Sequence, residues 1–98
     1  MKMLLIVFRE SIVTHIHSLL AEHNVTAYTE VHNVAGKGET GLAAKAFLSP
    51  GANCMILTAL PEAAAYRLAE AFSQFKAKHE HGHSLPLHVF SLPCEQII

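Results

Sequence analysis

Two unbroken apolar runs constrain the fold of this chain more than any other feature of its sequence. Residues 2–8 read Lys-Met-Leu-Leu-Ile-Val-Phe, and residues 53–60 read Asn-Cys-Met-Ile-Leu-Thr-Ala-Leu. Each run is too short for a helix and ends at charged residues or at a proline, which is typical of strands. Because neither run alternates apolar with polar residues, both faces of each predicted strand need cover.

Helical spacing of apolar residues follows each of the two runs. Residues 11–23 and 61–78 carry apolar side chains every three or four positions, which predicts two amphipathic helices. Ser11 is placed to cap the first helix, and Pro61 suits the first turn of the second. Each apolar strand is therefore followed by a helix that can cover one of its faces.

Two further strands complete the predicted order. Residues 25–34 are rich in Tyr, Thr and Val, which favours a strand. Residues 85–92 form the fourth predicted strand, and Pro86 lies near its start, where a missing N–H is tolerated. The resulting order, βαββαβ, predicts an α+β, ferredoxin-like single domain over residues 1–98, with a four-stranded antiparallel sheet and both helices on one face. No helix remains for the second face, so we expect another copy of the chain to cover it.

Composition excludes several classes of protein. The chain has 98 residues, of which 51% are hydrophobic and 15% charged, with a net charge of -1, as in globular domains. Lysines and arginines are scattered, which argues against a nucleic-acid partner. No apolar span approaches the ~18 residues of a membrane helix, and the N-terminal run lacks a signal-peptide cleavage site. We therefore expect a cytoplasmic protein.

The two cysteines are expected to be free thiols. The predicted strand order places the first strand between the third, which carries Cys54, and the fourth, which precedes Cys94. Two strand spacings amount to roughly 9–10 Å, which exceeds the ~7 Å between Cα atoms that a disulfide tolerates.

Glycine, charge and hydroxyl groups converge between the second and third predicted strands. This segment reads Gly36-Lys37-Gly38-Glu39-Thr40-Gly41 and literally matches Gly-x-Gly-x-x-Gly. It is not a Rossmann fingerprint, because residues 42–48 are too few for a crossover helix and no acidic residue follows ~20 positions later.

The same segment keeps two interpretations open. Closely spaced glycines expose backbone N–H groups that can cradle an anion, with Lys37 adding charge and Thr40 a hydroxyl. Alternatively, the glycines only let the chain leave a strand and turn. A connection of about 18 residues, far above the usual median of ~4–6, favours a loop with a function.

Histidine is abundant, with eight residues in the chain. Three of them, His79, His81 and His83, could together bind zinc or copper. The tract is only a compositional signal and spacing fixes no fourth ligand, which favours a solvated loop instead. We expect His88, on the fourth strand, to be a ligand contact. The remaining histidines are expected at the surface or at helix ends: His15, His17, His23 and His32.

Catalytic patterns do not emerge from the sequence. Ser11, Ser49 and Ser91 lack a nucleophile-elbow motif, and neither cysteine has a histidine partner fixed by spacing. We therefore do not expect an enzyme.

Several features, taken in order, resemble the P-II signalling superfamily, and most of all its shorter P-II-like branch. They are the βαββαβ order, Thr29-Glu30-Val31 ahead of Gly-x-Gly, the long loop, Leu60-Pro61-Glu62 and Val89-Phe90-Ser91-Leu92-Pro93. The resemblance covers nearly the whole chain. It implies a homotrimer whose sheets face inward, with lateral clefts that bind adenine nucleotides. It also implies that the long loop docks onto a target, often a membrane transporter or another regulated protein.

The resemblance also implies which residues line the clefts. They are Gly36, Lys37, Gly38, Glu39, Thr40 and Gly41 of the loop, Thr58 and Ala59 at the end of the third strand, and His88. The segment before the fourth strand departs from the family pattern, because Leu85-Pro86-Leu87-His88 stands where the family has Gly-x-Gly-Lys. AMP or ADP is therefore expected rather than ATP, and a different small ligand stays open. The rival hypothesis is a metal-ion binding protein of the same fold that uses the tract from His79 to His83.

Overall fold

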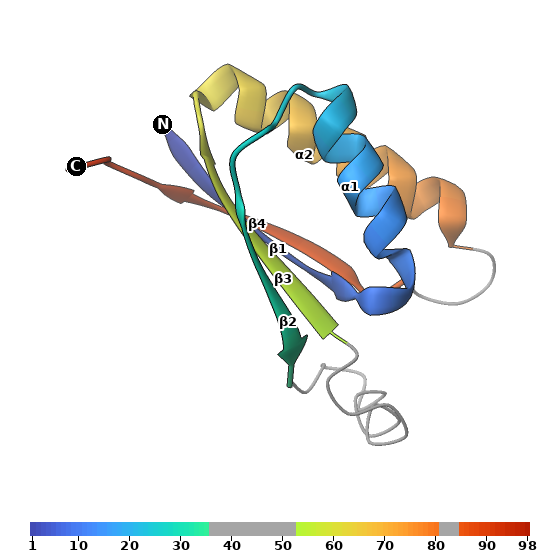
Figure 1. Ribbon diagram of the computed structural model, residues 1–98. Coiled ribbons are helices and arrows are strands. Elements are labelled where there is room, and N and C mark those ends of the chain that lie inside the picture. Colours follow the sequence, from blue (N-terminus) through green and yellow to red (C-terminus); the bar gives the residue numbers. More distant parts are fainter. Residues whose placement is uncertain (36–52, 81–84) are drawn as a thin grey trace.

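The computed structural model describes residues 1–35, 53–80 and 85–98. The predicted loop site at residues 36–41 lies outside the described residues, as do His81 and His83. The described part forms one antiparallel sheet with two long helices packed on one of its faces (Figure 1).

The observed elements follow the predicted order. They are β1 (Lys2–Arg9), the 3-10 turn η1 (Glu10–Ile12), α1 (Val13–Glu22), β2 (Thr29–Val34), β3 (Asn53–Leu60), α2 (Glu62–His79) and β4 (Leu87–Pro93). The sheet has four strands in the order β2-β3-β1-β4, and every neighbouring pair is antiparallel. The predicted ferredoxin-like class is therefore confirmed.

Strand β1 is the centre of the fold, because it pairs with β3 on one side and β4 on the other. Ile6 lies opposite Ile56 of β3 and opposite Val89 of β4. β1 therefore separates Cys54 from Cys94, and both cysteines are free thiols, as predicted.

The hydrophobic core lies between the sheet and the helices. Alternate side chains of β1 and β3 point toward the helices, as strand geometry requires, and pack against the apolar stripe of each helix. The core residues include Leu4, Ile6, Phe8, Ile16, Leu20, Cys54, Ile56, Ala65, Leu68 and Phe72.

The opposite face of the sheet is also apolar, and we call it the open face. Its central row runs through Leu57 of β3, Leu5 of β1 and Phe90 of β4. Leu5 and Leu57 are half-buried, and Phe90 is exposed. The expectation that β1 and β3 are apolar on both faces is confirmed. That another copy of the chain covers the open face stays a prediction.

Two local predictions need correction. Ser11 does not cap α1, because it lies inside η1 and the residue that precedes α1 is Ile12. The second strand begins at Thr29 rather than at Val25, because Asn24 ends the helix with a left-handed backbone (φ 60°) and Val25 then packs into the core. Within the described ranges, no helix is long and apolar enough to cross a bilayer.

Candidate functional site

His88, the predicted ligand contact on β4, lines a surface cavity of about 340 Å³ between α2 and β4. Its ring lies 6.4 Å from that of Phe90, at an interplanar angle of 26°. Lys76 of α2 lines the same cavity, and its Nζ donates a hydrogen bond of 3.0 Å to the carbonyl oxygen of Leu87. The backbone next to His88 therefore has a lysine ammonium beside it, although the segment Leu85-Pro86-Leu87-His88 itself contains no lysine.

Thr58 and Ala59 lie at the other end of the sheet from His88. They pair with Leu4 and Met3 of β1, whereas His88 pairs with Val7. Three or four residues along a strand span roughly 10–13 Å, so one copy of the chain does not bring these residues together. A cleft that used all of them would need two copies.

The Thr58 side chain already has a structural partner. It is only 2% exposed, on the face of the sheet that carries the helices, and its hydroxyl donates a hydrogen bond of 2.9 Å to the carbonyl oxygen of Ala27. Ala59 is exposed. Of the two, Ala59 is the one whose surface is open to a ligand.

The residues that flank the predicted loop site lie at the same end of the sheet as His88. Val34 at the end of β2 pairs with Asn53, Asn53 pairs with Arg9, and the neighbouring Phe8 pairs with Leu87. Both residues that flank the segment 36–52, Val34 and Asn53, therefore lie at the end of the sheet where β4 begins.

His79, the described member of the histidine tract, ends α2. Its Nδ1 donates a hydrogen bond of 2.8 Å to the carbonyl oxygen of Phe75, and its ring lies 4.2 Å from the Phe75 ring. His15 lies beside both rings. Among the residues described, no three His, Cys, Asp or Glu side chains are arranged to hold a metal ion. The metal site of the tract stays a prediction.

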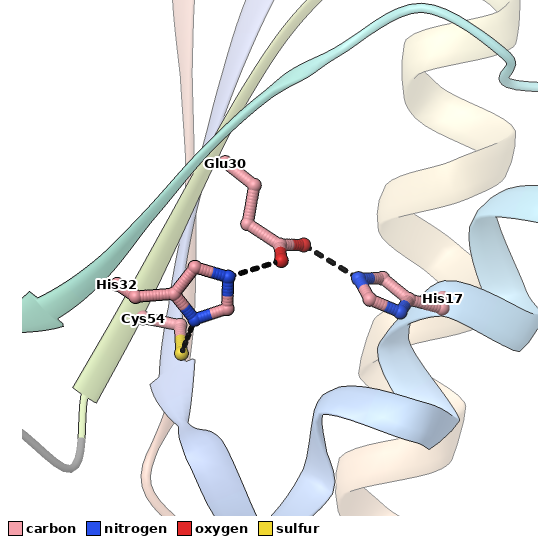
Figure 2. Close-up of polar contacts among 4 residues, drawn as sticks. All are labelled: His17, Glu30, His32 and Cys54. Carbon is pink, nitrogen blue, oxygen red and sulfur yellow. Dashed lines mark hydrogen bonds and ion pairs between the residues drawn. The ribbon is translucent and has the colours of Figure 1, made fainter.

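A cluster of polar side chains that the sequence analysis missed lies between α1 and the sheet. Glu30 of β2 points toward α1, with an imidazole on either side of its carboxylate (Figure 2). Its Oε1 lies 2.5 Å from Nε2 of His17, and its Oε2 lies 2.6 Å from Nε2 of His32. Nδ1 of His32 lies 3.4 Å from Sγ of Cys54. The cluster therefore joins α1, β2 and β3.

Electrostatics of the cluster follow from these contacts. Burial by itself would raise the pKa of Glu30, but the hydrogen bonds and positive charge of His17 and His32 outweigh it, so the pKa is lowered. Burial raises the pKa of the Cys54 thiol, and the negative charges of Glu10 and Glu30 raise it further. Glu30 is thus held as a carboxylate and Cys54 as a thiol.

The sequence contained part of the signal for this cluster. Glu30 and His32 are two residues apart on a strand, so their side chains share one face. His17 and His32 do lie at the surface, with side chains 43% and 49% exposed, as expected. What the sequence could not supply was the packing that brings α1 over β2.

Comparison with known protein families identifies the family of the chain. The family model for the nitrogen regulatory protein P-II matches residues 1–98. The chain belongs to this family, and it is a PII-like regulatory protein, which confirms the resemblance seen in the sequence. No curated protein matches the chain.

Solved structures of PII-like proteins are similar over most of the chain. CPII from Thiomonas intermedia K12, bound to ADP, AMP and bicarbonate, is 29% identical, with a TM-score of 0.67 over 99% of this chain and 94% of that one. CPII bound to ADP and bicarbonate is 31% identical, with a TM-score of 0.68 over 93% and 84%. A protein of Thermus thermophilus described as PII-like is 16% identical, with a TM-score of 0.63 over 93% and 84%, and shares the fold.

Proposed function

We propose that the protein is a trimeric regulator that binds an adenine nucleotide in clefts between its subunits. AMP or ADP is the expected effector, in preference to ATP, and the long loop after β2 is expected to contact the regulated protein. The observation that carries this proposal is the similarity to CPII, which was solved with ADP, AMP and bicarbonate bound. The proposal describes a regulator and not an enzyme.

The open face supports the trimer. Leu5 and Leu57 lie at its centre, with the exposed Phe90 beside them. Contiguous apolar surface of this kind usually marks a protein interface. Cover by two further copies would also allow His88 of one copy to face Ala59 of another, which a single copy keeps apart.

Positive charge near β4 supports a nucleotide with few phosphates. His88 stands where the resemblance calls for a lysine, and Lys76 lines the same cavity. The segment Leu85-Pro86-Leu87-His88 lacks both the lysine and the closely spaced glycines that the family motif offers to phosphates. A monophosphate or diphosphate therefore fits this end of the sheet better than a triphosphate.

Isothermal titration calorimetry with AMP, ADP and ATP, each with and without bicarbonate, tests the nucleotide proposal. We expect heat with AMP or ADP and weaker binding of ATP. Sedimentation of the same sample tests the trimer and should give a mass near three chains. A trimer that gives no heat with any of the nucleotides would refute nucleotide binding, and a monomer would refute the intersubunit cleft.

The partner is expected to be a membrane transporter or another regulated protein. Its binding should depend on which nucleotide occupies the cleft, because ligands act by favouring one state over another. Co-expression with the product of the neighbouring gene, followed by affinity purification with AMP, ADP or no nucleotide, tests this. Equal recovery under all three conditions would argue against regulation by nucleotide.

A further inference from the structure

His17, Glu30, His32 and Cys54, which form the cluster, are not among the residues proposed to line the nucleotide cleft. The cluster lies on the face of the sheet that carries the helices, and it links three elements through titratable groups (Figure 2). We infer that the cluster is a proton-responsive clamp, in which uptake of one proton by His17 tightens the link between α1 and β2. This inference does not rest on nucleotide binding.

The hydrogen bonds form a consistent chain when both imidazoles are neutral. The Cys54 thiol donates to Nδ1 of His32, and Nε2–H of His32 donates to Glu30. Nε2–H of His17 donates to the other carboxylate oxygen. This chain carries the single negative charge of Glu30, and each contact has one donor and one acceptor.

Addition of one proton to His17 neutralises the cluster without disturbing the other contacts. The bond to Glu30 then becomes an imidazolium–carboxylate bond, and such charge-assisted bonds are roughly twice as strong as neutral ones. Protonation of His32 instead would turn its Nδ1 into a second donor that faces the Cys54 thiol. The arrangement therefore directs the proton to His17.

A second proton is disfavoured by the geometry. Two imidazolium rings would flank one carboxylate and leave the cluster with a net positive charge. The other groups around the cluster are Glu10 of η1, whose charge acts on Cys54, and Tyr28, whose ring lies 6.2 Å from that of His17. Repulsion between two neighbouring imidazolium rings therefore favours the addition of a single proton.

Solvent can reach the clamp while Glu30 stays partly shielded. The side chains of His17 and His32 are 43% and 49% exposed, and that of Glu30 is 17% exposed. Imidazole is the side chain that ordinarily changes charge between about pH 5 and 8. The clamp can therefore respond within the physiological range of pH.

Strand β2 is the element that should move in response. It is the edge of the sheet, with β3 as its one paired strand, and it holds no fully buried side chain. Its pairing is irregular between Val31 and Val34, where Asn33 has a left-handed backbone (φ 59°). Little burial fixes β2, and the contact of Glu30 with His17 links this strand directly to α1.

A pH titration by nuclear magnetic resonance between pH 5 and 8 tests the clamp on the full chain. We expect the backbone amide signals of residues 29–34 to shift with one midpoint, which coincides with that of the His17 ring. In His17→Gln, which keeps an N–H donor but cannot take up the proton, this shift should be lost. In the matched control His15→Gln, two residues earlier on α1, it should remain.

Two results would overturn the inference. One is a wild-type protein in which the His17 ring titrates but the amide signals of residues 29–34 stay fixed. The other is a shift of these signals that persists undiminished in His17→Gln. The wild-type titration is informative by itself, so the test does not depend on the folding of the variant.

Discussion

His17 on α1 and Glu30 on β2, 13 positions apart in the sequence, meet at 2.5 Å. The contact ties the first helix to an edge strand whose other side chains are mostly exposed. Since Glu30 also contacts His32, its carboxylate has two imidazole partners, and its removal should affect both.

Glu30→Gln should destabilise the protein, and the effect should depend on pH. The pKa of Glu30 is lowered on folding, so its contribution is fully present above the ordinary value of 4.5 and is lost as pH falls through the lower, folded value. We expect the free energy of unfolding to fall by about 1 kcal/mol at pH 7. The loss is small because both histidines are about half exposed, and solvent weakens such contacts.

Urea unfolding of wild type and Glu30→Gln from pH 3 to pH 7 measures this difference. The difference in the free energy of unfolding between the two proteins should narrow as pH falls below 4.5. Glu22→Gln, an exposed position on α1, is the control and should differ little from wild type throughout. A gap that stays constant down to pH 3 would contradict the assigned role of the carboxylate.

Thr58→Val should reveal a structural role for the Thr58 hydroxyl. The hydroxyl is buried and donates to Ala27, so its loss leaves a carbonyl oxygen without its partner at a cost of about 1–2 kcal/mol. Thr58→Ser keeps the donor and should lose less. Thermal unfolding of the two variants checks this order, and a Thr58→Ser variant as unstable as Thr58→Val would contradict it.

The roles of Thr58 and Glu30 illustrate what the sequence could and could not predict. The apolar runs and helical spacing predicted the order of elements, because each pattern is local. The direction of the Thr58 hydroxyl and the partner of Glu30 depend on contacts between residues far apart in the chain. The family resemblance supplied the candidate cleft residues. It did not show that Thr58 and Ala59 lie far from His88 in the sheet, which follows from the pairing of β1 with β3 and β4.

Leu5→Glu should abolish the proposed trimer and leave the fold of each chain intact. Leu5 lies at the centre of the open face, away from the helices, so a carboxylate there is solvated in a monomer but buried in an assembly. Sedimentation should report a mass near one chain, and far-UV circular dichroism should be unchanged. Thr14→Glu, at an exposed position of α1, serves as the control and should remain trimeric.

The two thiols should differ strongly in reactivity. Cys54 lies in the core, and burial raises the pKa of its thiol, so the reactive thiolate is rare and shielded. Cys94 is partly exposed. Titration with a chromogenic disulfide at pH 8 should detect at most one fast thiol in the native protein and two after unfolding. Fast reaction of a thiol in native Cys94→Ser would show that Cys54 is accessible.

His88→Lys should shift nucleotide preference toward ATP if the proposed cleft is correct. The substitution restores the cation that the P-II resemblance calls for at this position, beside the cavity that Lys76 also lines. One added charge-assisted contact to a phosphate is worth about 1.4 kcal/mol, or roughly tenfold in affinity. Calorimetry should therefore show a larger gain for ATP than for AMP. His23→Lys adds the same charge at the end of α1 and should leave the ratio of the two affinities as it is in wild type. An unchanged ratio in His88→Lys would place the phosphates away from the start of β4.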